Sequence, residues 1–223
     1  MELRGEIANL SNLIEVIQQN NPKYTVLPKD FFESVLHDAP NFKNLQSGAW
    51  VELGVWKGGG ALFFKSLMNE LDIDEKLYLF DTFGKIPTNK LKHAKDIEFV
   101  NSFQISEQSG YLKDVQDLFD QFNLNENVLF IESDLEHIHK EQVPDKIAFL
   151  FIDLDFFEPI YKSLVLFYDN IVKGGVLIID DYYLDCLNCK EAVDEFFKER
   201  DIDLKSVSSR FSSYAIKIVK SKD

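Results

Sequence analysis

The chain has 223 residues, of which 45% are hydrophobic and 13% aromatic, and its formal net charge is −14 at pH 7. This composition is enough for one well-buried domain and excludes wholesale disorder. The acidic balance argues against a nucleic-acid-binding protein, because such a protein needs a basic face to meet phosphates.

The N-terminal sequence, the length of the apolar runs and the cysteine usage predict a cytoplasmic protein. The first residues, MELRGEIANL, are charged from the second position, which is not the pattern of a signal peptide. The apolar runs are strand-sized and well short of the ~20 residues that a membrane span requires. Cys186 and Cys189 form a C-x-x-C pair without further soft ligands nearby, so we expect two reduced cysteines at the start of a helix.

The N-terminal part is predicted to be helical. Apolar residues at positions 3, 7, 10, 13, 14 and 17 predict a helix over 3–19, which Asn-Asn-Pro ends, and a second helix is predicted over 28–38. Residues 1–44 are therefore assigned to an N-terminal helical segment. Its apolar stripe suits either closing over a site or joining copies of the chain into a homo-oligomer, and the sequence does not choose between them.

Strands alternate with helices in the rest of the chain, residues 45–223, with a polar, irregular stretch over 85–110. Strands are predicted over 49–55, 76–83, 127–133, 147–155, 174–181, 204–209 and 211–219, and helices over 57–71, 111–122, 157–171 and 188–200. The last two strands are too close for a parallel crossover and must pair antiparallel. The pattern predicts an α/β fold with a doubly wound, mostly parallel sheet of seven strands, the last one reversed.

Each of the first five predicted strands ends in polar residues, joined by a glycine at the first. They are Glu52 and Gly54, Asp81, Ser133 and Asp134, Asp153 and Asp155, and Asp180 and Asp181, in strand order. Because ligands of such sheets bind beyond the carboxyl ends of the strands, these residues predict a site at that edge.

A glycine-rich turn, VELGVWKGGGA, follows the first strand and opens a helix. It is not the dinucleotide motif G-x-G-x-x-G, because three residues separate Gly54 from Gly58. Glu52 would repel a phosphate here, but it suits a cation such as the amino group of an amino-acid-like cofactor.

The end of the second strand predicts a ribose site. Asp81 is placed to accept both hydroxyls of a ribose. A ribose and an amino acid without pyrophosphate describe S-adenosylmethionine (SAM), whose adenine would lie near the residues after the second and third strands. The predicted cofactor-binding residues are Glu52, Gly54, Val55, Trp56, Gly58, Asp81, Thr82, Phe83, Ser133 and Asp134.

Four segments together, VELGVWKGGG, LYLFDTFGKIP, FIDLDFFEPIYKSL and GGVLIIDDY, resemble the class I SAM-dependent methyltransferases. More narrowly, they are similar to the macrocin O-methyltransferase family, metal-dependent enzymes that methylate sugar hydroxyls on macrolides and related compounds. The resemblance covers roughly residues 45–220 and is carried most specifically by D-x-D at one strand end and D-D-Y at the next. It implies a Rossmann-like methyltransferase fold, and the identity of the sugar does not transfer.

Three carboxylates, those of Asp153, Asp180 and Asp181, are expected to converge at neighbouring strand ends. Close carboxylates repel one another unless they are protonated or neutralised by a cation, and oxygen ligands favour Mg²⁺. The resemblance implies that these three positions are metal ligands, so we hypothesise a Mg²⁺ site. Hydrogen bonds to loop backbone or helix N-termini are the alternative.

Two residues compete for the role of general base. Asp155 lies two positions after Asp153, on the same face if the strand persists, and the resemblance also favours it. His93 lies in the polar stretch, which is long enough to be an active-site lid, and its ordinary pKa of about 6.5 suits proton transfer.

The leading hypothesis is a Mg²⁺- and SAM-dependent O-methyltransferase that acts on a small-molecule sugar. The sugar may be free, nucleotide-linked, or part of a natural product or surface glycan. A catechol-like diol is the alternative acceptor, and a non-catalytic SAM-binding module is the alternative from another class.

Overall fold

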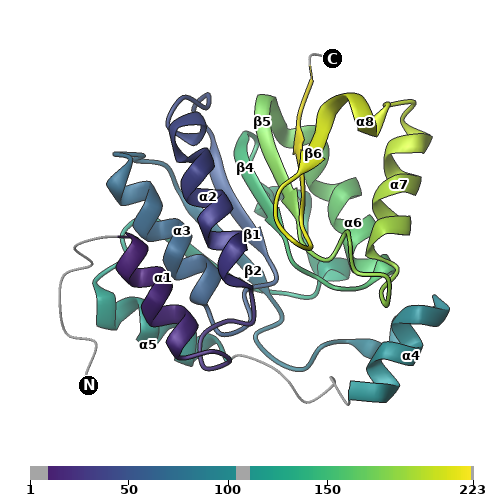
Figure 1. Cartoon of the computed structure of the whole chain (residues 1–223), viewed down its shortest axis with the longest axis horizontal. Helices are drawn as coiled ribbons and strands as arrows, with labels where there is room; N and C mark the ends of the chain where they lie inside the picture. Colours follow the sequence, from purple (N-terminus) through teal and green to yellow (C-terminus); the bar gives the residue numbers. More distant parts are fainter. Residues whose placement is uncertain (1–9, 104–110, 222–223) are drawn as a thin grey trace.

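The computed structural model describes residues 10–103 and 111–221, which form a seven-stranded sheet between helices (Figure 1). The strands are β1 (Ala49–Leu53), β2 (Leu77–Asp81), β3 (Val128–Glu132), β4 (Ile147–Ile152), β5 (Ile171–Ile179), β6 (Ser208–Arg210) and β7 (Ile216–Val219). Their order is β3-β2-β1-β4-β5-β7-β6, and β7 runs antiparallel to both of its neighbours while the other pairs are parallel. The predicted fold class is confirmed.

Helices cover both faces of this sheet. They are α1 (Leu10–Gln19), α2 (Lys29–Phe42), α3 (Gly59–Glu70), α4 (Ala94–Phe103), α5 (Leu112–Phe122), α6 (Phe157–Phe167), α7 (Cys189–Glu199) and α8 (Leu204–Val207). Short 3-10 helices are η1 (Thr88–Lys90), η3 (Leu135–His137), η4 (Lys140–Gln142) and η5 (Tyr168–Asn170). Helices α1, α2, α3 and α5 share one core cluster with the sheet, and α6 and α7 share the other (Figure 1).

The central strand β4 shows why these runs form buried strands. All six of its residues, IAFLFI, are buried, and from Phe149 to Ile152 successive side chains enter opposite cores, after a register shift between Ile147 and Phe149. Phe149 and Phe151 pack on the side of α2 and α3, where Trp50 stacks on Phe149 with ring centroids 4.4 Å apart. Leu150 and Ile152 pack on the side of α6 and α7.

Three sequence expectations need correction or restriction. The stretch 85–110 is not irregular throughout, because it contains η1 and α4. The strand expected over 204–209 is mostly the short helix α8, and β6 covers only 208–210. The helix expected over 3–19 is present as α1 from residue 10, and positions 1–9 lie outside the described residues.

The division at residue 44/45 stays a prediction, as does a homo-oligomer through the N-terminal helices. Helix α2 nevertheless belongs to the main core, since Phe31 is fully buried and its ring centroid lies 4.9 Å from that of Phe151 in β4. No helix in the described part of the chain combines the length and the hydropathy needed to cross a membrane.

Candidate active site

The carboxyl ends of the central strands are level. In the sheet register Leu53 pairs with Ile152, and Ile152 pairs with Ile179. The ladder continues for one more residue, since Asp153 N donates to Leu53 O and Asp180 N donates to Ile152 O, both at 2.9 Å. The polar residues that follow the strands therefore start side by side at one edge of the sheet, as expected.

A cavity of about 1010 Å³ lies at this edge. Most of the residues predicted to bind the cofactor line it, namely Glu52, Gly54, Val55, Trp56, Asp81, Thr82, Ser133 and Asp134. Asp153 and Asp155 line it as well, so the cofactor half meets part of the acidic half in one cavity, whereas Asp180 and Asp181 are buried and absent from the lining. Gly58 and Phe83 are absent from the lining, and the Phe83 side chain is buried in the core instead.

Glu52 presents a buried carboxylate to this cavity. Its side chain is 2% exposed, and Oε2 has no hydrogen-bond partner among the described residues. Burial, and then the charge of Asp81, raise its pKa well above the ordinary value. A Cβ on Gly60 would lie 2.7 Å from Glu52 Oε1, so the glycine leaves room for the carboxylate. Such a group is suited to a cationic ligand atom.

Asp81 ties the glycine-rich turn to the end of β2. Its Oδ2 accepts hydrogen bonds from Val55 N at 2.7 Å and Trp56 N at 2.9 Å. Its Oδ1 accepts one from Phe83 N at 2.8 Å. The carboxylate thus positions the turn, and the predicted contact with a ribose stays a prediction that would use its remaining lone pairs.

The turn itself requires glycine at two positions. Gly54 has φ +88°, and a Cβ there would lie 1.8 Å from the carbonyl oxygen of Asp153. Gly58 has φ +83° and precedes α3, where a Cβ would lie 2.8 Å from Val115 Cγ1. Gly58 therefore lets α3 start close against α5, and its predicted contact with the cofactor stays a prediction.

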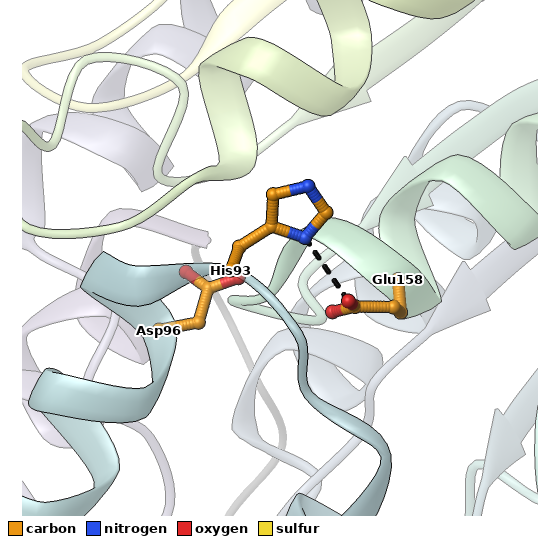
Figure 2. Close-up of side chains that lie close together, drawn as sticks. All are labelled: His93, Asp96 and Glu158. Atoms are coloured by element: carbon orange, nitrogen blue, oxygen red, sulfur yellow. Dashed lines mark hydrogen bonds and ion pairs between the residues drawn. The ribbon is translucent and has the colours of Figure 1, made fainter.

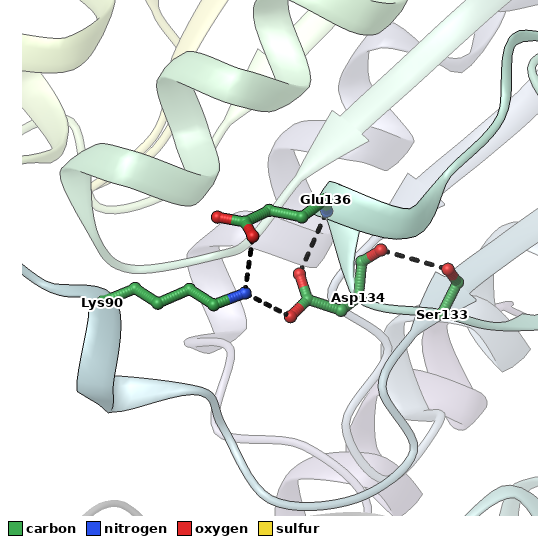
Figure 3. A network of polar contacts seen from close by, with 4 residues as sticks. All are labelled: Lys90, Ser133, Asp134 and Glu136. Carbon is green, nitrogen blue, oxygen red and sulfur yellow. Dashed lines mark hydrogen bonds and ion pairs between the residues drawn. The ribbon is translucent and has the colours of Figure 1, made fainter.

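A charged network closes the side of the cavity near η1 and η3 (Figure 3). Lys90 Nζ donates to Asp134 Oδ2 at 3.1 Å and to Glu136 Oε2 at 2.8 Å. Burial alone would raise the pKa of Asp134, but hydrogen bonds from Glu136 N and Lys90 outweigh it and lower the pKa. Ser133 Oγ donates to the carbonyl oxygen of Asp134 at 3.0 Å. Lys90 thus holds Asp134 ionised at the predicted adenine end.

Acidic side chains lie close together as expected, but the closest three are not the three that were predicted to bind the metal. One carboxylate oxygen from each of Asp153, Asp155 and Asp181 lies within 4.8 Å of the others, and Asp180 is not part of this set. The strand ends at Ile152, so Asp155 is not placed by a persisting β-pleat as predicted. Its φ of +58° turns the chain instead, and Asp181 has a matching φ of +59°. Positive φ at non-glycine residues is uncommon and is often found at functional sites.

Burial and mutual repulsion act on all four carboxyls. Burial, and then the charges of neighbouring aspartates, raise the pKa of Asp153 and that of Asp181 well above the ordinary value. Burial is also the first cause that raises the pKa of Asp155, and it raises the pKa of Asp180 to about 7. Asp180 Oδ1 is buried without a hydrogen-bond partner among the described residues. An all-oxygen set with an orphaned carboxylate atom fits a hard divalent cation such as Mg²⁺.

A known protein family matches most of this chain. The model of the macrocin O-methyltransferase (TylF) family matches residues 35–209, which is most of the chain. The chain belongs to the macrocin O-methyltransferase family. The resemblance found in the sequence is thereby confirmed.

The chain is also similar to curated proteins that are named as O-methyltransferases. The demethyldecarbamoylnovobiocin O-methyltransferase of Streptomyces niveus is 29% identical over 158 residues, which are 70% of this chain and 60% of the relative. The mycinamicin III 3''-O-methyltransferase of Micromonospora griseorubida is 28% identical over 155 residues, 67% of this chain and 60% of the relative. The matched part thus spans about 60% of the length of these relatives.

Solved structures show the shared fold. The O-methyltransferase NovP aligns with a TM-score of 0.83 at 21% identity, covering 96% of this chain and 98% of NovP. The calicheamicin methyltransferase CalS11 aligns with a TM-score of 0.59 at 17% identity, covering 94% and 91%. This member of the macrocin O-methyltransferase family therefore has the Rossmann-like methyltransferase fold.

His93, the second candidate for the general base, does not lie among the residues that line the cavity. Its ring stacks on Phe157 with centroids 3.7 Å apart, and its Nδ1 lies 3.0 Å from Glu158 Oε1 (Figure 2). His93 thus already has a stacking partner and a carboxylate partner, and its role as general base stays a prediction.

Sequence reasoning missed several residues that shape the site of this macrocin O-methyltransferase family member. Lys90 and Asp96 belong to residues 85–103, the segment between β2 and α5 that we call the insert, and Glu158 contacts it. A lone acid or lysine in a polar stretch carries no periodic signal, so these residues emerge only from the folded arrangement. The spacing Asp155-Phe-Phe-Glu158 was visible in the sequence, and it places Glu158 in the first turn of α6.

Proposed function

We propose that the chain is a SAM-dependent O-methyltransferase that methylates a sugar hydroxyl of a glycosylated small molecule and uses a bound Mg²⁺. The observation that carries this proposal is the single cavity that Asp153 and Asp155 share with the glycine-rich turn and Asp81. A methyl donor and an acceptor hydroxyl bound in that cavity would lie next to each other. Membership of the macrocin O-methyltransferase family supports the same reaction class.

The cofactor half provides a group for each part of SAM. Glu52, buried and without a partner at Oε2, would hold the amino group, and Asp81 would accept from the ribose. Ser133 and Asp134 would lie beside the adenine. Phe83, which we predicted as an adenine neighbour, contributes instead through its backbone N–H to Asp81.

The acidic half would hold the cation. Asp153, Asp180 and Asp181 remain the proposed Mg²⁺ ligands, and Asp155 lies close enough to Asp153 and Asp181 to share that role. When bound, SAM supplies a methyl group already activated by its sulfonium, and Mg²⁺ lowers the pKa of an acceptor hydroxyl that it binds. Asp155 would take the proton from that hydroxyl, while the cavity walls keep the reacting atoms in line.

The charge of the cavity favours a neutral glycoside over a nucleotide-linked sugar. The carboxylates that line it are those of Glu52, Asp81, Asp134, Glu136, Asp153, Asp155 and Glu158, whereas the lining lysines are Lys90 and Lys162. Lys90 is already paired with Asp134 and Glu136. A pyrophosphate would therefore meet more acidic than free basic side chains, which favours a neutral acceptor.

Apolar side chains in the lining of the cavity suit an apolar aglycone. Phe99 and Phe103 of α4 face this space together with Tyr161 and Val165 of α6. Phe103 is 61% exposed and Val165 45% exposed, which is a large apolar surface for residues beside a polar site. A ring system attached to the sugar would cover them.

Methyl transfer from SAM to a panel of acceptors tests the proposal. Purified protein would be assayed with neutral glycosides, nucleotide sugars and catechols, each with Mg²⁺ and with EDTA. We expect turnover of a glycoside that chelation abolishes and Mg²⁺ restores. Turnover that survives thorough chelation would remove the cation from the mechanism, and SAM binding without turnover of any acceptor would favour a non-catalytic module.

The substitution Asp180→Asn separates the cation site from the cofactor site. We expect it to lower methyl transfer at least ~100-fold while the affinity for SAM stays near the wild-type value, because Asp180 lies outside the cofactor half. Asp185→Asn removes the same charge from an exposed position in the same loop and should leave both unchanged. A large loss of SAM binding in Asp180→Asn would mean that this carboxylate serves the cofactor.

A further inference from the structure

Helix α4 buries a carboxylate where most helices bury an apolar side chain. Asp96 is fully buried, and it is the buried residue of this helix, whose other side chains are exposed or half-buried. Figure 1 shows α4 at the lower right, away from the sheet, and its half-buried Phe99 and Val100 pack against the core cluster that α6 and α7 share. A buried carboxylate is costly unless its oxygens are satisfied, so the partners of Asp96 indicate what it does.

Both oxygens of Asp96 accept hydrogen bonds from backbone groups of two other elements. Oδ2 accepts from Phe157 N, the first residue of α6, at 2.9 Å. Oδ1 accepts from Asn188 N, directly before α7, at 2.7 Å. One side chain therefore bridges the starts of the two helices that follow β4 and β5.

Those two helix starts end the loops that carry the acidic cluster. Phe157 comes two residues after Asp155, and Cys189, next to Asn188, donates from Sγ to the carbonyl oxygen of Asp180 at 3.1 Å. The last backbone hydrogen bond between β4 and β5 runs from Asp180 N to Ile152 O. Beyond this bond, the two hydrogen bonds of Asp96 connect the same two loops a second time.

We propose that Asp96 is a positioning residue that fixes the spacing between the loop of Asp153 and Asp155 and the loop of Asp180 and Asp181, and so presets the cation site. The two loops contain aspartates at φ near +60°, a conformation that persists only when surrounding contacts enforce it. The inference rests on the proposed Mg²⁺ site. It assigns a function in that site to the insert 85–103, which contributes none of the proposed ligands.

Neighbouring contacts stabilise the same attachment. His93, one turn before Asp96 in the insert, pairs with Glu158 in the first turn of α6 (Figure 2). Lys95 Nζ lies 3.0 Å from Glu191 Oε1 in the first turn of α7. Both pairs are partly exposed and add little on their own, so the buried Asp96 is the residue to change.

The test is the affinity for Mn²⁺, measured by electron paramagnetic resonance on the protein without SAM or acceptor. Asp96→Asn keeps the shape but turns one acceptor oxygen into a donor that faces a backbone N–H. We expect the dissociation constant for Mn²⁺ to rise about 10- to 100-fold, as for other residues that orient ligands without touching the metal. The affinity for SAM should change less than twofold. Glu98→Gln removes a carboxylate from an exposed position of the same helix and should change neither.

Each other outcome decides against the inference. Unchanged Mn²⁺ affinity in folded Asp96→Asn would overturn it, and an equal loss of SAM affinity would show that Asp96 supports the whole fold. If Asp96→Asn does not fold, Asp96→Glu, which keeps both oxygens but shifts them by one methylene, is measured instead, with the same expected loss and the same contrary results. Wild-type protein that binds no Mn²⁺ would overturn the proposed cation site and this inference together.

Discussion

Gly54 lies where the backbone of the glycine-rich turn approaches the end of β4 most closely. A Cβ at this position would be 1.8 Å from the carbonyl oxygen of Asp153, and φ is +88°. We expect Gly54→Ala to lower the free energy of unfolding by at least ~3 kcal/mol and to weaken SAM binding, because both the turn and the strand end must move.

A second glycine separates the two causes of this loss. Gly174 has φ +77° but no atom within 4 Å of its hypothetical Cβ. Gly174→Ala should therefore show only the cost of the backbone conformation, roughly 1–2 kcal/mol. Urea denaturation of both variants measures the difference, and equal losses would mean that the close approach at Gly54 is relieved without cost.

The residues of the acidic cluster were predictable by type and position, but their conformation was not. Asp153 and Asp180 follow apolar runs that the sheet register makes level, so their neighbourhood follows from the sequence. The positive φ of Asp155 and of Asp181 depends on the loops around them, which the sequence pattern does not encode. Strand pleating therefore predicted the neighbourhood of Asp155 but not the turn that produces it. For the same reason the sequence did not show that Asp180 lies outside the set formed by Asp153, Asp155 and Asp181.

At the scale of elements, α4 was missed because its only buried side chain is a carboxylate. Helix prediction relies on apolar side chains at helical spacing, and in this helix Phe99 and Val100 are only half-buried at the edge of the core cluster that α6 and α7 share. The strands were predicted well because buried parallel strands are uninterrupted apolar runs, of which β4 is the clearest.

The segment around η1 gives an element-scale prediction. Lys90 joins it to Asp134 and Glu136 across the cavity, and hydrogen bonds with Glu136 and then Asp134 raise the pKa of Lys90. We expect Lys90→Ala to speed the dissociation of SAM severalfold in stopped-flow measurements while Tm barely changes, because exposed ion pairs add little to global stability.

Lys92→Ala is the matched control for this prediction. Lys92 is exposed in the same segment, and its hydrogen bond to Glu158 uses the backbone N–H, which the substitution keeps. Its SAM kinetics should match the wild type. Equal acceleration in both variants would show that the general charge of the segment, and not the tie to Asp134, retains the cofactor.

At the scale of the whole molecule, the net charge of −14 is partly concentrated in buried carboxyls at one edge of the sheet. Burial raises the pKa of Asp180 to about 7, from an ordinary value of about 4. Between these values the folded metal-free protein holds more protons than the unfolded chain, so this group makes the protein less stable as the pH rises.

The resulting prediction concerns metal-free protein. We expect its Tm to be lower at pH 8 than at pH 5, and Mg²⁺ to raise Tm mainly at pH 8, because the ionised carboxylates bind the cation. In Asp180→Asn both the pH dependence and the Mg²⁺ effect should shrink. Calorimetric scans at the two pH values measure these changes. A metal-free Tm that rises toward pH 8 in the wild type but not in Asp180→Asn would contradict a raised pKa at Asp180.

We propose that folding gathers the strand-end carboxylates into a cation site beside the SAM cavity. The most direct measurement is anomalous diffraction from crystals grown with Mn²⁺ and SAM. We expect one strong peak between Asp153, Asp180 and Asp181, with or without Asp155 as a further ligand. Crystals with SAM bound and no peak there, or a peak only at the group formed by His93, Asp96 and Glu158, would contradict it.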